Sequence, residues 1–387
     1  MYKIINRRKL IFTQAADIVG RALCTPFKFF NKTLAIDPQA VKSILIIRTA
    51  YIGDAIMTIP IIKPLKEHFP NAQISFLTSE GGAQALANNP HLDEILTYNP
   101  FWFYNSAKVK YLSFLKEIRK HSFDLVIEAR ADIREILLIA TPIRAKHTVS
   151  YGVGGGGYLL TDVVPYENLK HKVQYHLDIA RHLGADVNSI DWAIYPTYVE
   201  KERVAQILKD NKIKTPFVVL HPGARLPLKR WFTEQYAKLY DTLIDKLKIY
   251  PVIAASKDDV RLVGEIVSQM THKVANLTGR LNIREFAWVL KQSEFFICND
   301  SAPLHVASAM KVPTVAIFGP SKSIETGPYG NIHRVVEKSE FRCRYKCDEN
   351  SCHIGHYHAC MKSITVEDVV NSVESLLREL GVGRQNA

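Results

Sequence analysis

The sequence predicts an α/β fold in which two doubly wound parallel sheets form two domains. Three observations support this prediction. Apolar, β-branched runs alternate with helix-like segments from residue 42 onward, the alternation restarts near residue 216, and four apolar runs end in loops rich in Gly, Asp or Pro. Such alternation is typical of parallel sheets, which bind ligands at the carboxyl ends of their strands. One loop lies early and three lie late, so we expect a ligand site between the two halves.

The first half supplies five predicted strands and three predicted helical segments. The strands are residues 43–48, 73–77, 94–98, 124–128 and 148–151, and the helical segments are 54–68, 108–121 and 133–139. Pro60 and Pro64 should kink the first of these helices. The glycine run at 154–157 lacks the spacing of a dinucleotide fingerprint, and we expect a flexible loop there, with substrate contact as the alternative.

The second half repeats the pattern after a polar, irregular stretch at 184–215, which we predict contains the domain junction. The predicted strands are 217–220, 252–255, 295–298 and 314–318, and the predicted helices are 233–246, 257–270, 283–291 and 302–310. A second doubly wound domain follows from the same argument. A helix over 172–183 precedes the junction, and an amphipathic helix over 366–380 closes the chain.

The composition is that of a globular protein with a basic first segment. The chain has 387 residues, which is enough for two domains, and 47% of them are hydrophobic while 23% are charged. The formal net charge is +12, and residues 1–32 hold seven basic side chains against one acid, Asp17. Because no nucleic-acid module or basic-aromatic pattern is present, this charge indicates phosphorylated small molecules or anionic lipids as partners, and no nucleic acid.

Residues 2–24 have apolar side chains at helical spacing with Arg and Lys between them, a pattern typical of a helix that lies on a membrane surface. Asp17 and Arg21 interrupt the apolar run, which argues against a spanning segment, and Asp17 also argues against a cleavable signal peptide. A terminal helix packed on its own domain is the alternative. We expect a cytoplasmic protein that rests on a membrane.

The segment Asn-Asp-Ser-Ala-Pro after the strand at 295–298 predicts a phosphate anchor. Asp300 or Ser301 can cap the helix that follows, and capping alone is the structural alternative for both. The free N–H groups and the dipole at a helix start attract phosphate. His305 lies in the same turn, and the loop with Lys229 and Arg230 supplies a cation for a pyrophosphate.

Asp54 follows Gly53 after the first predicted strand and its six-residue loop. An Asp at this place is most often a helix cap. Its position opposite phosphate-binding loops favours another role, because a carboxylate that projects into a sugar-nucleotide cleft can take the proton of an attacking hydroxyl. We therefore predict that Asp54 is a general base.

Three segments together resemble a known family: ILIIRTAYIGDAIMTIPIIKPLKEHFPNAQISFLTS, LHPGARLPLKRW and NDSAPLHVASAMKVPTVAIFGPS. They are similar to the heptosyltransferases that build the lipopolysaccharide inner core, glycosyltransferase family 9, and the resemblance covers roughly residues 42–380. It implies a GT-B fold, with two Rossmann-like doubly wound domains facing a central cleft. It also implies an ADP-heptose type donor bound by the C-terminal domain, an acceptor bound by the N-terminal domain, and inverting transfer without a catalytic metal.

Residue by residue, the resemblance implies that Asp54 is the general base and that Lys229 faces the donor phosphate. The implied donor-binding segment comprises Asp300, Ser301, Ala302 and His305. Many members have glycine where Ala302 stands, which alters the room beside the donor. Many have serine or threonine pairs where this chain has Ala50 and Tyr51, so the acceptor-binding residues stay unknown.

Four of the six cysteines form a cluster, accompanied by three histidines: Cys343, Cys347, Cys352, Cys360, His353, His356 and His358. In a chain otherwise poor in cysteine, this favours a metal site over disulfides, with metal-free thiols as a further alternative. Some members of the resembled family carry a similar segment, including relatives that glycosylate proteins and bind iron there. We predict a structural zinc or iron on the four cysteines, because four thiolates leave no open position for catalysis.

The resulting prediction is an inverting transferase of heptose from a nucleotide-diphosphate donor to the lipopolysaccharide core, peripheral on the cytoplasmic face of the inner membrane. A heptosyltransferase acting on protein side chains and a non-catalytic nucleotide-sugar-binding protein are the alternatives. The predicted parts are a basic amphipathic extension at 1–40, an acceptor domain at 41–190, a linker region at 191–215, a donor domain at 216–340, a Cys/His-rich loop at 341–362, and a terminal helix with tail at 363–387.

Overall fold

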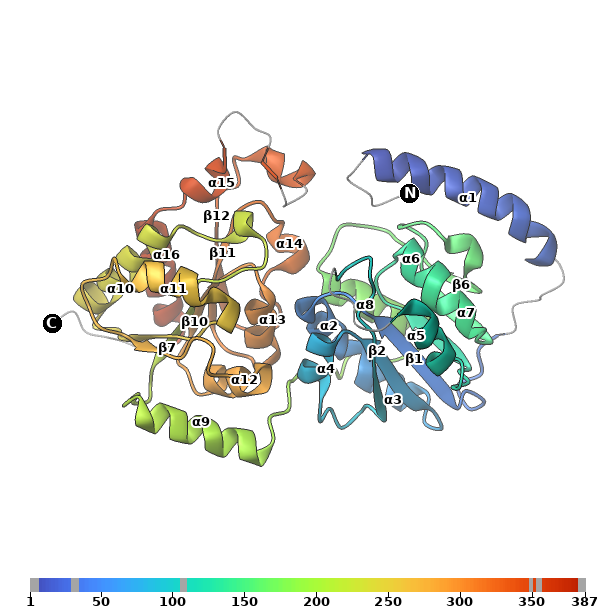
Figure 1. Cartoon of the computed structure of the whole chain (residues 1–387), viewed down its shortest axis with the longest axis horizontal. Coiled ribbons are helices and arrows are strands. Elements are labelled where there is room, and N and C mark those ends of the chain that lie inside the picture. The colour runs from blue at the N-terminus through green and yellow to red at the C-terminus, as the bar shows by residue number, and fades with distance from the viewer. Residues whose placement is uncertain (1–6, 29–34, 105–109, 348–350, 353–356, 382–387) are drawn as a thin grey trace. The chain divides into compact units, whose positions relative to one another are not determined.

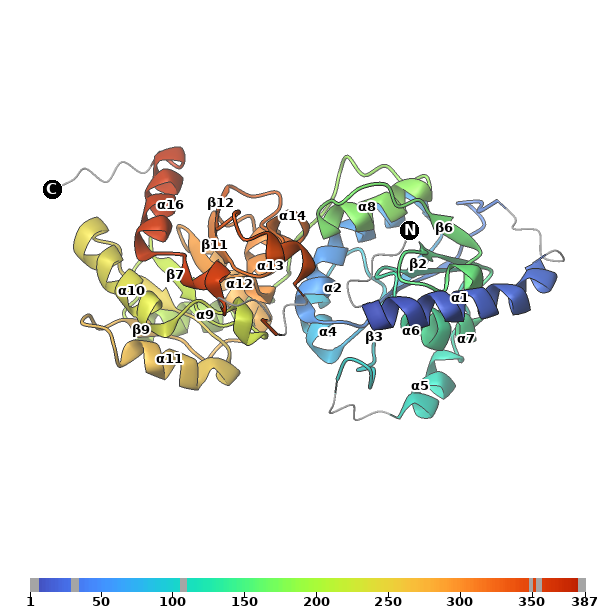
Figure 2. The same cartoon turned by 90° about the horizontal axis from the view of Figure 1, so that it is seen from above.

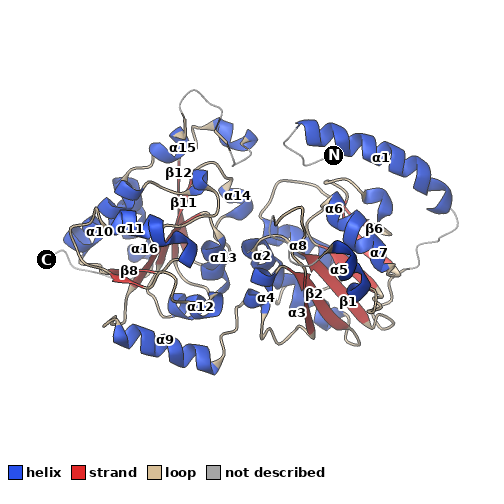
Figure 3. Cartoon of the chain, in the orientation of Figure 1, coloured by secondary structure: helices blue, strands red, loops and turns tan. Residues whose placement is uncertain are grey.

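The computed structural model of the chain describes residues 7–28, 35–104, 110–347, 351–352 and 357–381. The chain divides into two compact units, Met1–Ala193 and Ile194–Ala387, which we call the first and the second domain. Each domain contains one parallel sheet with helices packed around it (Figures 1 and 3).

The first domain has six parallel strands in the order β3-β2-β1-β4-β5-β6. They are β1 (Ser43–Arg48), β2 (Gln73–Thr78), β3 (Glu94–Thr97), β4 (Leu125–Glu128), β5 (His147–Tyr151) and β6 (Asp162–Val164). Five of them match the predicted strands. The sixth, β6, was not predicted, because three residues are too few to show an alternating pattern.

The helices of the first domain are α1 (Arg7–Lys28), α2 (Ile52–Thr58), α3 (Ile62–His68), α4 (Glu80–Leu86), α5 (Tyr111–Ile118), α6 (Ile133–Glu135), α7 (Thr141–Ile143) and α8 (Lys172–His182). Short 3-10 turns cover Ile59–Ile61 and Gly157–Leu159, and a π-helical turn covers Ile136–Ala140. The predicted helix over 54–68 is interrupted where the kink was expected. Pro60 lies in the 3-10 turn between α2 and α3 because proline cannot continue the helical hydrogen bonds.

The second domain also has six parallel strands, in the order β12-β11-β10-β7-β8-β9. They are β7 (Val218–His221), β8 (Pro251–Ile253), β9 (Ala275–Asn276), β10 (Phe296–Asn299), β11 (Thr314–Phe318) and β12 (His333–Glu337). Its helices are α9 (Tyr198–Asp210), α10 (Thr233–Leu247), α11 (Val260–Val267), α12 (Ile283–Lys291), α13 (Ala302–Ala309), α14 (Ser323–Thr326), α15 (Ala359–Lys362) and α16 (Val366–Glu379). Three further 3-10 turns lie at Pro227–Lys229, Lys257–Asp259 and Arg342–Lys346.

The two sheets have the same topology. Counted from β9, the second sheet runs β9-β8-β7-β10-β11-β12, which repeats the order of the first sheet from β3 to β6. In each domain the winding reverses between two central strands, β1 and β4 in the first and β7 and β10 in the second. Ligands bind outside the carboxyl ends of the strands at this point in doubly wound sheets.

Both cores are built from strands buried on both faces. In β1 every residue after Ser43 is buried, and in β7, β10 and β11 every residue is buried. This explains the near-continuous apolar runs in the sequence, which are typical of parallel sheets. Helix α16 belongs to the core of the second domain through five buried residues, Val369, Val370, Val373, Leu376 and Leu377, in agreement with the predicted amphipathic pattern.

The segment 191–215, predicted as a linker region, contains a regular helix. The boundary between the domains falls at residues 193 and 194, and α9 begins at Tyr198. Thr197 and Glu200 form a reciprocal capping box at its start, and Glu200 also pairs with Arg284 at 2.7 Å. The capping signature was present in the sequence, but the many polar residues of α9 hid its helical period.

The glycine run 154–157, which we expected as a flexible loop, lies close to the backbone of the loop after β4 and to α1. A Cβ on Gly154 would lie 1.6 Å from the carbonyl oxygen of Ala131, and Gly155 and Gly156 have φ angles of +91° and +77°. Asp17 of α1 is buried and accepts a hydrogen bond of 2.9 Å from the N–H of Gly156. The glycines therefore allow the close approach of α1 and of the loop after β4.

Helix α1 combines the two alternatives considered for the first segment. Through Asp17 it is packed on its own domain, near α6 (Figure 2). Its other side exposes large apolar side chains, namely Ile11, Phe12, Ile18, Val19 and Leu23. Among the described helices, α1 included, none is both long enough and apolar enough to cross a membrane.

Candidate functional site

Asp54 lies in the first turn of α2, at the carboxyl end of β1. The last residue of β1, Arg48, donates a hydrogen bond from Nη2 to Asp54 Oδ1 at 2.6 Å. Lys172, the first residue of α8, lies 3.5 Å from the same oxygen. Asp54 is therefore held by two cations at the point where the first sheet changes its winding.

The guanidinium of Arg48 is almost completely buried, with 5% of the side chain exposed. Its Nε and Nη1 atoms have no hydrogen-bond partner within the described part of the chain. A buried donor without a partner is costly, by about 1–3 kcal/mol. Arg48 thus has hydrogen-bond donors that its contact with Asp54 does not use. They lie where the carboxyl ends of the strands meet, which we call the edge of the first sheet.

Two buried glutamates lie at the same edge of the first sheet. Glu135 accepts a hydrogen bond from the N–H of Thr49 at 3.2 Å and a very short one from the Thr49 hydroxyl. Glu128, the last residue of β4, accepts hydrogen bonds from the N–H groups of Arg130 and Ala131. Burial, and then the charge of Glu135, raise the pKa of Glu128 well above its usual value. This pair holds together the loops after β1 and β4.

In the second domain the structure brings Lys229 and Asp300 together. Lys229 closes the 3-10 turn after β7, and its Nζ lies 2.8 Å from Asp300 Oδ2, directly after β10. Burial alone would raise the pKa of Asp300, but the charge and hydrogen bond of Lys229 hold it below the usual value. Asp300 is thus an ion-pair partner in the structure, and the predicted capping alternative does not apply to it.

Ser301 is the N-cap residue of α13, and Ala302 is the first residue of the helix. The side chain of Ser301 makes no capping hydrogen bond, although Pro303 stands in the first turn as predicted. His305 is buried in the same turn. The Ser301 side chain therefore does not cap the backbone N–H groups at the start of α13. Uncapped N–H groups at a helix start suit the binding of a phosphate.

Asn299 positions this helix start and was not singled out in the sequence. It is fully buried, and its Oδ1 accepts hydrogen bonds from the N–H of Trp231 at 3.2 Å and from the hydroxyl of Tyr236 at 3.0 Å. Its Nδ2 donates to the carbonyl oxygen of Pro222 at 2.7 Å. One amide thus connects β10 with the loop that carries Lys229.

The cysteine segment does not support the predicted structural zinc or iron. Cys343, Cys347 and Cys352 are partly buried, Cys360 is buried, and none of the four forms a disulfide. Burial, and then the neighbouring cysteines, raise the pKa of Cys360 to about 11. Within the described residues no three Cys, His, Asp or Glu side chains are arranged to hold a metal ion. His353 and His356 lie outside the described residues.

The same segment instead contacts the loops of the second-domain edge. His358 donates from Nε2 to the carbonyl oxygen of Leu228 at 2.7 Å, one residue before Lys229. Arg344 donates to the carbonyl oxygen of Ser321 at 2.8 Å, in the loop after β11. A Cβ on Gly319 would lie 2.7 Å from the end of Met361. The segment therefore supports the loops after β7 and β11.

A family model described as "Glycosyltransferase family 9 (heptosyltransferase)" matches residues 111–358, more than half of the chain. The chain belongs to glycosyltransferase family 9. It is 26% identical over 347 residues to "Lipopolysaccharide heptosyltransferase 3" of Escherichia coli (strain K12), covering 85% of this chain and 96% of that protein.

Two solved structures show the fold. The glycosyl transferase family 9 protein from Veillonella parvula DSM 2008 has a TM-score of 0.75 at 23% identity and covers 89% of this chain and 99% of that one. The E. coli ADP-heptose lps heptosyltransferase II has a TM-score of 0.68 at 20% identity and covers 88% and 99%. The predicted GT-B class with two Rossmann-like domains is confirmed.

The family 9 motifs led to Asp54, Lys229 and Asp300, but sequence reasoning missed the cations of the first domain. Arg48 ends a predicted strand and was counted as part of it. Lys172 begins a predicted helix far along the chain from Asp54. The motif Arg-Ala-Asp-Ile-Arg at 130–134 could have been found, because it is a polar segment that follows a predicted strand. The four loops that predicted the ligand site have the same placement.

Proposed function

We propose that this family 9 chain transfers heptose from ADP-heptose to the inner core of lipopolysaccharide. The names of the similar proteins support the sugar, the nucleotide and the acceptor. One observation carries the proposal: each sheet has a group of polar residues at the carboxyl ends of its central strands, and the two groups occupy equivalent positions in the topology. One has Asp54 beside Arg48 and Lys172, and the other has Lys229 beside the start of α13.

In the proposed reaction an acceptor hydroxyl attacks the anomeric carbon of the heptose from the face opposite the diphosphate. The new C–O bond forms as the bond to the diphosphate oxygen breaks, which inverts the configuration. The hydroxyl proton passes to the carboxylate of Asp54, and ADP leaves with the bonding electron pair. Arg48 and Lys172 hold the carboxylate in one orientation, which is what a positioned base requires.

The second domain would bind the donor and meet the charge that develops on its diphosphate. Lys229 supplies a cation, and the first N–H groups of α13 supply hydrogen-bond donors and the positive end of the helix dipole. Asp300 orients Lys229, and His305 and Ala302 border the same turn. In this mechanism side chains and backbone carry the positive charge, and no catalytic metal takes part.

We place the enzyme on the cytoplasmic face of the inner membrane, held by α1. The exposed apolar side chains of this helix lie among exposed basic residues, Arg8 and Arg21, which suits an anionic lipid surface. Phe12→Ser/Ile18→Ser should reduce binding to vesicles of anionic phospholipid. Because Asp17 is kept, the helix should remain packed on the first domain. Unchanged vesicle binding would contradict a membrane role for α1.

The test of the activity uses the purified chain, ADP-heptose and lipopolysaccharide from cells that lack this protein. We expect release of ADP with an equal amount of heptose added to the core, measured by mass spectrometry, and NMR of the product should show the inverted anomer. ADP release without a modified core, or heptose found on protein side chains, would contradict the proposed acceptor. Donor binding with no turnover would indicate the non-catalytic alternative.

A further inference from the structure

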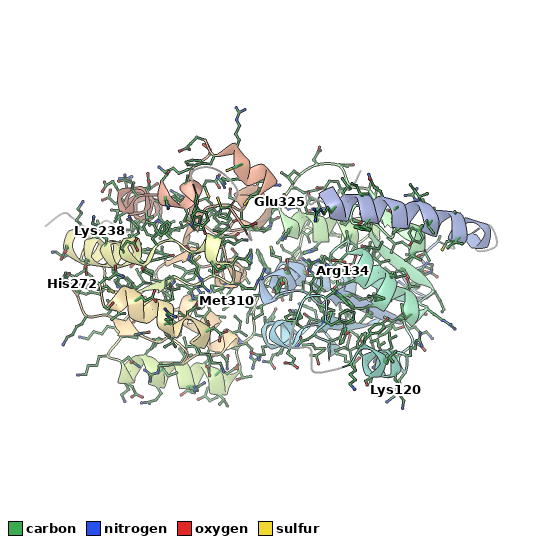
Figure 4. The ribbon with its side chains drawn as sticks, turned by 45° about the horizontal axis from the view of Figure 1, so that its top comes forward. Lys120, Arg134, Lys238, His272, Met310 and Glu325 are labelled. Atoms are coloured by element: carbon green, nitrogen blue, oxygen red, sulfur yellow. The ribbon has the colours of Figure 1, made fainter. Side chains whose placement is uncertain are left out.

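A second basic group lies in the first domain, where Arg130 stands on the loop after β4 and Arg134 stands in α6. The guanidinium carbon of Arg130 lies 4.1 Å from the ring centre of Phe103, and that of Arg134 lies 4.7 Å from the same ring (Arg134 is labelled in Figure 4). Both distances are within the range of cation–π interactions. One aromatic ring therefore contacts both arginines.

The carboxylate of Asp132 pairs with both guanidinium groups. Arg134 donates to Asp132 through Nε at 2.9 Å and Nη2 at 2.6 Å, and Nε of Arg130 lies 3.3 Å from the same carboxylate. The backbone between them is held by Glu128, and Ala131 has a φ of +62°, in the left-handed region. These contacts constrain the loop and hold both guanidinium groups beside one carboxylate.

The contacts within the chain leave the arginines incompletely satisfied. Nη1 of Arg130 is buried without a hydrogen-bond partner within the described ranges. The side chains of Arg130 and Arg134 are 28% and 41% exposed, so both can still reach a ligand. Two arginines share the single carboxylate of Asp132, whose side chain is 11% exposed. One carboxylate cannot balance the charge of two guanidinium groups, so a second anion would complete the group.

The arginine pair belongs to the same edge as Asp54. Tyr51 precedes α2 as its N-cap residue, and its ring lies 6.3 Å from Phe103 and 5.9 Å from Tyr104. The hydroxyl of Tyr104 donates to the carbonyl oxygen of Ala50 at 2.9 Å. These aromatic side chains connect the loop of Arg130 to the turn that presents Asp54.

The partly exposed charges at this edge are mostly positive. The partly exposed carboxylates are Asp54 and Asp132, whereas Glu128 and Glu135 are buried. The partly exposed cations are Arg130, Arg134 and Lys172. An arginine fork binds phosphate and carboxylate groups in preference to neutral sugar hydroxyls. The fitting ligand is therefore an oxyanion.

We propose that Arg130 and Arg134, stacked on Phe103, form a subsite that binds a phosphate or carboxylate group of the acceptor saccharide beside Asp54. This inference rests on the proposed function, because it takes the ligand to be the acceptor of the transfer. The subsite would hold the anionic group while a neighbouring hydroxyl approaches the Asp54 carboxylate. It assigns acceptor contacts that the sequence left unknown.

The main test is Arg130→Gln/Arg134→Gln, measured with the lipopolysaccharide acceptor of the activity assay. The matched control is Arg119→Gln/Lys120→Gln, which removes two exposed cations at the end of α5 in the same domain (Lys120 is labelled in Figure 4). We expect the acceptor KM to rise about ten- to a hundred-fold in the first variant and less than two-fold in the control. The Kd for ADP-heptose should not change in either.

Removing both arginines leaves the Asp132 carboxylate without its cationic partners, so a second variant controls for misfolding. Arg130→Gln/Asp132→Asn/Arg134→Gln removes the same donors without leaving an unpaired carboxylate, and it should show the same rise in KM. The variants should melt within a few degrees of the wild type. An acceptor KM like that of the wild type in a folded variant would overturn the proposal.

Modified acceptors identify the oxyanion. Phosphatase treatment removes phosphate monoesters from the lipopolysaccharide, and carbodiimide-mediated amidation neutralises its carboxylates. The wild type should bind one of these two forms more weakly, and the double variant should not distinguish that form from the untreated acceptor. Equal loss in wild type and variant would contradict the subsite. Direct binding of the acceptor, measured without donor, would still reveal the subsite if the proposed transfer itself failed.

Discussion

The two domains have the same strand order and the same point of reversal, yet their edges carry different chemistry. In the first domain the loops after β1 and β4 present a carboxylate, Asp54, among arginine and lysine side chains. In the second, the loops after β7 and β10 present one lysine and the start of a helix. Doubly wound topology sets the place where ligands bind, and the loop residues set the chemistry that each edge offers.

The two edges also differ in how they are supported. Side chains from within the first domain hold its loops, mainly the buried Glu128 and Glu135. The second edge depends on Asn299 and on the cysteine segment, through His358 and Arg344. Substitutions in each domain can therefore separate the proposed role of Asp54 from that of Lys229.

The largest effect should come from Asp54→Asn in the first domain. The amide keeps the shape of the side chain but cannot take the proton of the attacking hydroxyl. The kcat should therefore fall by about 10²- to 10⁴-fold. The Kd for ADP-heptose, measured by calorimetry, should stay within two-fold. If the variant keeps more than a third of wild-type turnover at saturating acceptor, Asp54 is only a residue of the helix start.

Lys229→Met in the second domain should weaken donor binding and slow transfer together. The Lys229 charge would contact the diphosphate both before and during bond cleavage, and charge-assisted hydrogen bonds are worth about 1.5–3 kcal/mol. We expect a rise in the donor Kd of about ten-fold or more. Lys238→Met, on the exposed side of α10, is the matched control and should leave the Kd unchanged (Figure 4). An unchanged Kd in Lys229→Met would remove Lys229 from the donor site.

His358→Ala tests whether the cysteine segment supports the donor edge. Loss of the hydrogen bond to Leu228 leaves a carbonyl oxygen unsatisfied and should cost about 1–3 kcal/mol of stability. The donor Kd should rise several-fold, because the turn that ends at Lys229 loses its anchor. Tyr357→Phe, at an exposed neighbour, should change neither quantity. A destabilised variant with wild-type donor affinity would limit the segment to a structural role.

The smallest effect should be a pH-dependent change in Glu135→Gln. Since burial and Glu135 raise the pKa of Glu128 in the folded state, the wild type loses stability as pH rises from the ordinary glutamate range, about 4.3, through that raised pKa. Removing the Glu135 charge lowers the pKa of Glu128 and reduces this loss. Urea unfolding should show the variant gaining stability relative to the wild type as pH rises above the ordinary glutamate range.

The control for this change is Glu117→Gln, an exposed carboxylate of α5 in the same domain. The pKa of Glu117 is lowered by Lys120, so its contribution to stability is present above the usual range of glutamate and is lost on acidification. It should therefore show no gain as pH rises. A gain of equal size in both variants would mean that the carboxyl pair is not responsible.

The sequence by itself determined the architecture. Apolar runs of strand length, helical spacing between them and glycine-rich loops at their ends were enough to predict two doubly wound domains, because each signal is local and repeats along the chain. The same locality, together with the family 9 motifs, led to Asp54, Lys229 and Asp300, which stand in the loops and helix starts that follow strands. Short elements such as β6 and the polar helix α9 were missed, because they carry weak local periodicity.

Only the tertiary structure decided which side chains meet. Lys172 reaches Asp54 across 118 residues, and Lys229 meets Asp300 across 71. The glycine run lies against α1, and a Cβ there would prevent the close approach. Within the described residues the clustered cysteines are not arranged to hold a metal ion. Such contacts depend on distances between elements remote in sequence, and residue spacing along the chain carries no information about those distances.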